Sequence, residues 1–173
     1  MILRAKSLAV LLVLWAIQVS IFAHLRPFGV APDLLLVAAV VGGLSGGAEY
    51  GARNGFAAGL LLDLVVPGPL GLAAGIYGTF GYLAGQFSRT VDSEDPRVMP
   101  GLIWVSTFLA TIGYGAGLGV LGSEQFVSAG LLGTALLVGL YAIPLALLVR
   151  PAYGWVLADS TGARAEPARS VVN

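Results

Sequence analysis

The sequence predicts an all-α integral membrane protein with six transmembrane helices in one compact bundle. Of its 173 residues, 57% are hydrophobic and 10% are charged, and the mean hydropathy is +0.89. Soluble domains carry about 25% charged residues. A water-soluble fold of this length could not bury so much apolar surface, whereas apolar stretches that approach the ~20 residues needed to cross hydrocarbon recur along the chain.

Six apolar stretches are expected to be the membrane spans. They lie at Ser7–Ala23, Asp33–Gly47, Asn54–Val66, Leu70–Phe87, Gly101–Leu121 and Phe126–Val149. The second and third are short, and they could instead form one bent hairpin with Glu49 and Arg53 at its tip. The transmembrane domain then covers residues 1–150. Residues 151–173 form a cytoplasmic C-terminal tail, which is expected to be disordered beyond Trp155.

Basic residues are distributed unequally between the two sides of the membrane. When the connections are assigned alternately, one side carries Arg26 alone. The other side carries the remaining eight of the nine Lys and Arg residues, namely Arg4, Lys6, Arg53, Arg89, Arg97, Arg150, Arg164 and Arg169. Because basic residues are retained in the cytoplasm, both termini and the connection at Ser88–Pro100 are expected to be cytoplasmic. The first apolar run is expected to be an uncleaved signal anchor rather than a cleaved signal peptide.

Asp63 is the one charged residue clearly inside an apolar stretch. A carboxylate near hydrocarbon is costly unless it is paired, capped or neutralised. The third span runs outward, so Asp63 lies near its outer end, just before the Pro67–Pro69 corner. There it can accept hydrogen bonds from the free amides of residues 70–72, or pair with Arg26. We expect it to fasten the hairpin between spans three and four; the alternative is a site for a proton, a cation or a ligand.

Pro32 and Asp33 lie at the outer start of span two. Proline suits the first turn of a helix, and an acidic residue suits the positive end of the helix dipole. An ordinary helix start is therefore expected at this position.

Many of the 25 glycines are four residues apart. Small residues at this spacing share a helix face and let two backbones approach closely. The main run is Gly43, Gly47, Gly51, Gly55 and Gly59, and further pairs are Gly71 with Gly75, Gly81 with Gly85, and Gly113 with Gly117. We expect most of them to pack inside the bundle; a docking groove for a span of another protein is the alternative.

The sequence offers few groups for chemistry. It has no Cys and a single His, which excludes a thiol nucleophile and a His-cluster metal centre. No Ser–His–Asp set and no paired carboxylates are expected, and zero formal net charge gives no sign of a nucleic-acid partner. We therefore predict no enzyme, no cofactor and no metal. An ion-coupled pump usually needs several ionisable groups in the membrane, so it is disfavoured too.

Four motifs, in their order and spacing, resemble the rod shape-determining protein MreD family. A proline opens span two, G-x-x-x-G-L-L-x-D follows, then L-G, then an aromatic residue near the end of span four. Here these are Pro32-Asp33-Leu34, Gly55 to Asp63, Leu70-Gly71 and Tyr82. The residue-level match covers Pro32 to Gly85, while the six spans and inside termini agree over nearly the whole chain. The Gly-rich spans and the tail after Arg150 depart from the pattern.

The resemblance implies a non-enzymatic scaffold subunit of the bacterial cell-elongation complex in the cytoplasmic membrane. It would help to control lateral peptidoglycan synthesis and cell shape. The implied partners are an MreC-like single-span periplasmic scaffold and, through the complex, MreB filaments and a wall-synthesis polymerase and transpeptidase. Membrane lipid is the other expected contact. The candidate structural or interaction residues are Asp63, Pro32, Asp33, Gly55, Gly59, Gly71 and Arg26.

The family's architecture is also similar to that of the substrate-binding subunits of energy-coupling-factor vitamin transporters. Those subunits dock onto a partner through an A-x-x-x-A pattern near span one, which Ala5 to Ala9 satisfies. A vitamin site should gather polar and aromatic side chains at its outer mouth. The outer connections offer few besides His24, Arg26 and Glu124, so a transport subunit is the alternative function.

Overall fold

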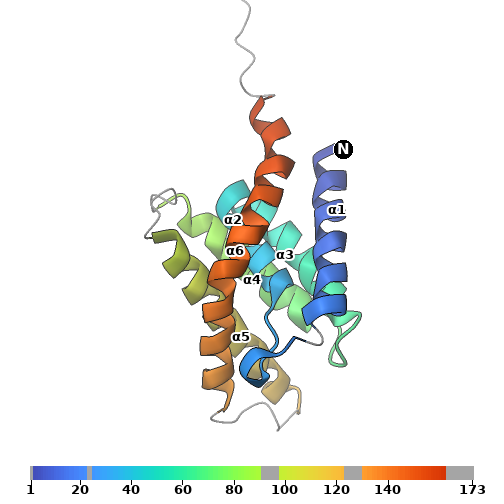
Figure 1. Cartoon of the computed structure of the whole chain (residues 1–173), viewed down its shortest axis with the longest axis vertical. Helices are drawn as coiled ribbons and strands as arrows, with labels where there is room; N and C mark the ends of the chain where they lie inside the picture. Colours follow the sequence, from blue (N-terminus) through green and yellow to red (C-terminus); the bar gives the residue numbers. More distant parts are fainter. Residues whose placement is uncertain (1, 23–24, 91–97, 123–129, 163–173) are drawn as a thin grey trace, which may run out of the picture.

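The computed structural model describes residues 2–22, 25–90, 98–122 and 130–162, which are all-helical apart from short connections. The elements are α1 (Ile2–Ile17) with a π-helical continuation η1 (Gln18–Phe22), a 3-10 turn η2 (Pro27–Gly29), α2 (Leu34–Gly46), α3 (Ala48–Asp63), α4 (Leu72–Phe87), α5 (Val98–Val120) and α6 (Gly130–Gly162). Figure 1 shows α2, α3 and α4 in the middle of the molecule, between α1 at one edge and α5 at the other.

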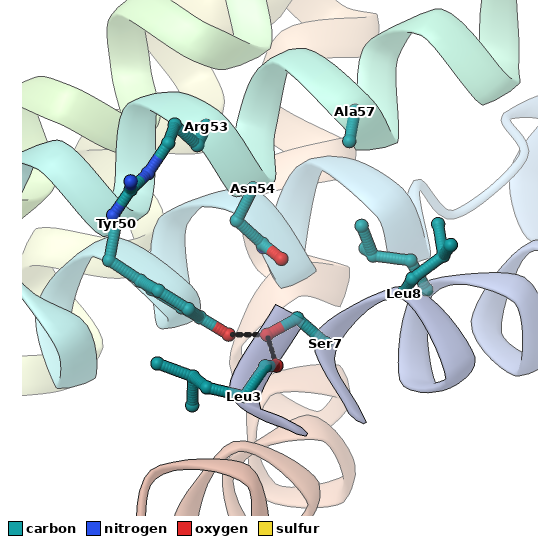
Figure 2. A pocket seen from close by; sticks show the side chains of 8 residues that line it. Leu3, Ser7, Leu8, Tyr50, Arg53, Asn54 and Ala57 are labelled. Atoms are coloured by element: carbon teal, nitrogen blue, oxygen red, sulfur yellow. Dashed lines mark hydrogen bonds between the residues drawn. The ribbon is translucent and has the colours of Figure 1, made fainter. Parts of the chain in front are cut away.

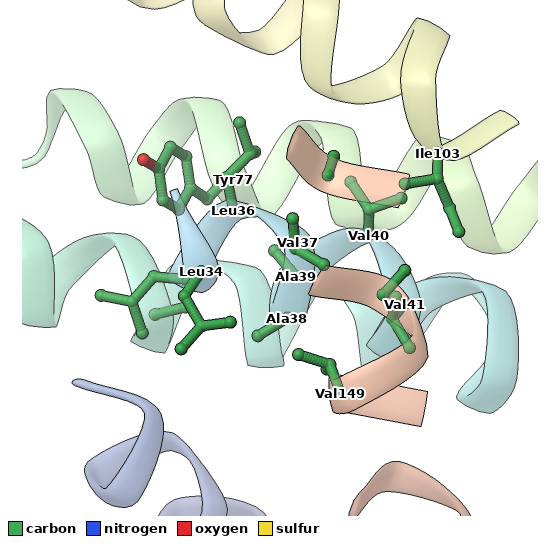
Figure 3. Close-up of a cluster of buried hydrophobic side chains, with 14 of the residues drawn as sticks. Leu34, Leu36, Val37, Ala38, Ala39, Val40, Val41, Tyr77, Ile103 and Val149 are labelled. Atoms are coloured by element: carbon green, nitrogen blue, oxygen red, sulfur yellow. The ribbon is translucent and has the colours of Figure 1, made fainter. Parts of the chain in front are cut away.

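The core is built around α2. All residues from Leu34 to Leu44 are buried, and the helix contacts α1, α3, α4, α5 and α6. A helix that is hydrophobic on every side has to be surrounded by other elements, and α2 has no polar residue among these positions. Figure 3 shows Val41 of α2 in a cluster with Tyr77 of α4, Ile103 of α5 and Val149 of α6.

The helices α3 and α4 pack against each other almost backbone to backbone. A Cβ atom added at Gly55 would clash with the backbone carbonyl of Tyr77, and one added at Gly59 would clash with that of Ala73. Gly51 meets the backbone of α4 in the same way, one turn earlier on α3. Close approach through small residues is how helices associate where no hydrophobic drive exists between them. These glycines therefore pack inside the chain.

One of the predicted glycine pairs does not pack. Gly71 precedes α4 in a left-handed conformation, and Gly75 lies on an exposed face of α4. A Cβ atom at either position would meet no atom within 4 Å. The spacing alone was misleading here because Gly71 is not part of the helix that carries Gly75.

Among the described residues, three helices are long and apolar enough to cross a membrane, over Ala5–Phe22, Val98–Val120 and Gly130–Ala158. The helices α2, α3 and α4 have 13, 16 and 16 residues. At 1.5 Å per residue they measure about 20–24 Å, against ~30 Å of hydrocarbon. The described residues form six α-helices, the number of helices that the sequence predicts. That all six cross the membrane, and that both termini lie in the cytoplasm, stay predictions.

The connection between α2 and α3 is shorter than predicted. It is Gly47 alone, with φ of 84°, a left-handed conformation that glycine adopts without steric cost. Glu49 and Arg53 therefore do not form a hairpin tip but lie inside α3, where they make an exposed i,i+4 ion pair at 3.5 Å. The charged run was misleading because α3 begins at Ala48 rather than at Asn54.

The last helix continues beyond the sequence boundary at residue 150. It runs to Gly162 through Pro151, and Tyr153 and Val156 are fully buried. Proline removes one helical hydrogen bond but is tolerated in membrane helices, where other groups satisfy the freed carbonyl. The boundary between residues 1–150 and the tail stays a prediction, but it falls inside α6. Residues 163–173 of the tail lie outside the described residues.

Candidate functional site

The Asp63 carboxylate caps the N-terminus of α4. Its Oδ2 accepts hydrogen bonds from the amides of Gly71 at 2.9 Å and Ala74 at 3.1 Å, and its Oδ1 accepts one from Ala73 at 3.2 Å. The first amides of a helix lack partners within it, and the helix dipole there favours negative charge. Asp63, the last residue of α3 and 8% exposed, supplies the cap that the glycine at the N-cap position cannot.

The capped amides differ in part from those expected from the sequence. Gly71 is among the expected donors, but the others are Ala73 and Ala74. The reason is that α4 begins at Leu72, with Gly71 as its N-cap, so the free amides of a capped helix fall at residues 73 and 74. Gly71 has φ of 94°, a conformation that favours glycine.

Asp33 caps α2 and also joins it to α4. As the N-cap residue, its Oδ1 accepts a hydrogen bond from the Leu36 amide at 2.9 Å. Its Oδ2 accepts a second from the hydroxyl of Tyr77, a residue of α4 that is 3% exposed. The expected helix start is present. Pro32, however, precedes the N-cap and does not occupy the first helical turn.

Gln18, in the π-helical continuation η1 of α1, binds the backbone at the start of α2. Its Nε2 donates to the Pro32 carbonyl at 3.0 Å, and its Oε1 accepts from the Leu34 amide at 2.9 Å. The start of α2 is thus held from two sides, by Gln18 and by Tyr77. These contacts are not predictable from the sequence, because a lone glutamine at the end of an apolar run has no characteristic pattern.

Arg26 is not brought to either carboxylate. It is the N-cap residue of η2, and its carbonyl accepts from the Gly29 amide at 3.0 Å. Within the described ranges no ion pair joins it to Asp63. His24 and Glu124, the other polar residues of the predicted outer connections, lie outside the described residues.

The geometry of the two aspartates favours a structural role. Both occupy helix ends, and every one of their four carboxylate oxygens accepts at least one hydrogen bond from an amide or a phenol. In the described part of the chain, no group of three or more His, Cys, Asp or Glu could hold a metal ion. Asp33 connects α2 to α4, and Asp63 connects α3 to α4. Both contacts lie near the α3–α4 connection, where the chain reverses direction.

A second polar cluster involves no charged residue, and the pattern of charges does not indicate it. Asn54 of α3 is 5% exposed, and its Nδ2 donates to the Ala38 carbonyl at 3.2 Å and to the Tyr153 hydroxyl at 2.6 Å. It joins α2, α3 and α6. The sequence signal for it is an asparagine between the closely spaced glycines Gly51 and Gly55.

A family model for the rod shape-determining protein MreD matches residues 2–153. The chain belongs to the MreD family. The match includes both aspartates and every glycine of the α3–α4 contact, and the resemblance predicted from the sequence is confirmed. Comparison with curated proteins and with solved structures gives no match.

Membership of the MreD family implies a role in determining rod shape. Together with the three long apolar helices, it indicates a protein of the inner membrane. The transport-subunit alternative gains no support from these comparisons.

Proposed function

We propose that this MreD-family protein is a non-catalytic scaffold subunit of the cell-elongation complex, and that it helps to control lateral peptidoglycan synthesis. The observation that carries the proposal is the family match over residues 2–153. The two aspartates support it, because each is engaged in holding helix ends together. The proposed topology has six crossings with both termini in the cytoplasm, as the eight-to-one distribution of basic residues favours.

The proposed direct partner is an MreC-like single-span periplasmic scaffold, with MreB filaments and the wall-synthesis polymerase and transpeptidase joined through the complex. A shallow groove on the solvent-exposed side of the α3–α4 pair supports this. Its volume is about 370 Å³, and it is lined by Ala52, Phe56, Ala74, Gly75, Gly78, Thr79 and Tyr82. Small residues in such a groove let a partner helix approach closely. Here a span of the partner would lie along the α3–α4 pair.

The proposal is tested by depleting the protein in a rod-shaped host and supplying the wild type or a variant in its place. Depletion is expected to give wide or round cells, and the wild-type gene is expected to restore the rod. Gly75→Leu should fail to restore it, because the leucine fills the groove while the protein still reaches the membrane. Gly133→Leu is the matched control, since Gly133 of α6 also has no atom within 4 Å of an added Cβ.

Cell width is measured by microscopy at equal membrane levels of each variant. Unaltered shape after depletion contradicts the function. Full rescue by Gly75→Leu contradicts the docking face while leaving the function in place.

A further inference from the structure

A cavity between α1 and α3 has the features of a ligand site. Its volume is about 650 Å³, and it lies along the N-terminal half of α3, away from the aspartates at the other helix end. Figure 2 shows its walls: Ser7 and Leu8 of α1 face Tyr50, Asn54 and Ala57 of α3 across the cavity. One end is polar, and the other is apolar.

The most informative group in this cavity is the carbonyl oxygen of Asn54. The amide nitrogen of Asn54 is held by the Ala38 carbonyl and the Tyr153 hydroxyl. Because a backbone carbonyl can only accept, the nitrogen has to face Ala38. The carbonyl Oδ1 is buried and has no hydrogen-bond partner among the described residues, and Figure 2 shows it directed towards Ser7. Buried polar atoms are rarely left without partners, so this oxygen indicates a donor supplied by a ligand.

The neighbouring polar groups suit a hydroxylated ligand. The Ser7 hydroxyl donates to the Leu3 carbonyl at 2.8 Å, so it accepts from the Tyr50 hydroxyl, which lies 2.8 Å away. A hydroxyl has one hydrogen to donate and two lone pairs, so the pair has acceptor capacity left. Together with the Asn54 carbonyl it can accept several hydrogen bonds from the hydroxyls of a polyol. A phosphate dianion, which has no hydrogen to donate, could not use this set.

The mouth of the cavity is basic. Arg53 lines it, with a side chain that is 59% exposed and forms an ion pair with the exposed Glu49. Such surface pairs are weak, so a phosphate can replace Glu49 as the partner of the guanidinium. A second cavity of about 520 Å³ shares Leu3, Tyr50 and Arg53 with the first and adds Arg89. Two arginines and one glutamate leave a net charge of +1, which suits a phosphodiester.

The remaining wall is apolar. Leu3, Leu8, Leu11 and Ala57 form it, and Leu8 is also 52% exposed on the outer surface of α1. An acyl chain could lie over these residues while its headgroup enters the polar end. Basic pockets between membrane helices on the cytoplasmic side are typical sites for anionic headgroups.

We propose that these adjoining cavities bind one anionic glycerophospholipid with a polyol headgroup, of the phosphatidylglycerol type. The phosphate lies between Arg53 and Arg89, a headgroup hydroxyl donates to the Asn54 carbonyl, and an acyl chain covers Leu8 and Leu11. The lipid would brace α1 against α3, because the cavity lies between these two helices.

The test is native mass spectrometry of the full-length protein, released from nanodiscs that contain phosphatidylcholine with either phosphatidylglycerol or phosphatidylmethanol. Phosphatidylmethanol keeps the phosphodiester charge and both acyl chains but has no headgroup hydroxyl. Retention of phosphatidylglycerol is expected to be at least about fivefold greater, as one net hydrogen bond of ~1 kcal/mol predicts. Both lipids are compared on the wild-type protein, so the result does not depend on whether a variant folds.

A variant tests the phosphate contact separately. Arg53→Gln should reduce retention of both anionic lipids, whereas Arg150→Gln, which alters an exposed residue of α6 outside both cavities, should leave retention unchanged. Equal retention of phosphatidylglycerol and phosphatidylmethanol, no retained lipid, or no effect of Arg53→Gln would each overturn the proposal. So would displacement of the lipid by free glycerol 3-phosphate at micromolar concentration, because the site would then take a soluble phosphate ester.

Discussion

Gly59→Ala is expected to disrupt the α3–α4 pair, although it adds only one methyl group. The new Cβ would clash with the carbonyl group of Ala73 and with the Cα of Ala74. These are backbone atoms, so no side chain can rotate away, and the two helices have to separate along their length. Overpacking a core usually costs about 1–3 kcal/mol. We expect a loss of unfolding free energy at or above the upper end of that range here.

The matched control is Gly75→Ala on α4, where an added Cβ meets no atom within 4 Å. Alanine is favoured over glycine in a helix by about 1 kcal/mol, so this variant is expected to be as stable as the wild type or slightly more stable. The thermal unfolding midpoint in detergent, followed by size-exclusion chromatography, measures both. A Gly59→Ala protein with an unchanged midpoint would show that α3 and α4 do not pack through their backbones.

Asp63→Ala is expected to destabilise the same hairpin by removing its cap. Three amides at the N-terminus of α4, those of the N-cap Gly71 and of Ala73 and Ala74, lose their acceptor. Removal of an N-cap side chain costs about 0.5–2 kcal/mol, and buried donors left without partners add to this cost. We therefore expect a loss of at least about 2 kcal/mol in unfolding free energy.

The Asp63→Asn variant distinguishes the effect of the cap from the effect of the charge, because it removes the charge and keeps one acceptor oxygen. Asparagine keeps one carbonyl oxygen that can accept from an amide at the N2 or N3 position, so its loss should be clearly smaller than that of alanine. Thermal unfolding in detergent and the level in the membrane are the measurements. If Asp63→Ala is as stable as the wild type, the capping role is wrong. If both variants lose the same unfolding free energy, the charge of Asp63 and not its hydrogen bonds stabilises the hairpin.

The α3–α4 hairpin illustrates what local sequence can predict. A lone acidic residue before a Pro-Gly-Pro corner, followed by a helix, was enough to indicate the Asp63 cap. The glycine spacing on α3 likewise indicated close packing, since both signals depend on residues near one another in the chain. The donors were misassigned by only a few positions, because the exact start of α4 at Leu72 depends on the conformation of Gly71.

The long-range polar contacts could not be predicted in this way. Asn54 meets Tyr153, which is 99 residues away, and Asp33 meets Tyr77, which is 44 residues away. Nearly every face of every helix is apolar, so periodicity does not reveal which faces meet. Which helix lies at the centre was also hidden, because α2 resembles the other apolar stretches in composition.

The most direct test of the proposed scaffold function is purification of the tagged protein from native membranes in a gentle detergent, with mass spectrometry of what accompanies it. We expect a single-span periplasmic coiled-coil protein together with wall-synthesis enzymes, recovered with wild type and with Gly133→Leu but depleted with Gly75→Leu. Recovery of ATPase subunits and a coupling membrane protein in their place would contradict the scaffold function and make this chain a transport subunit.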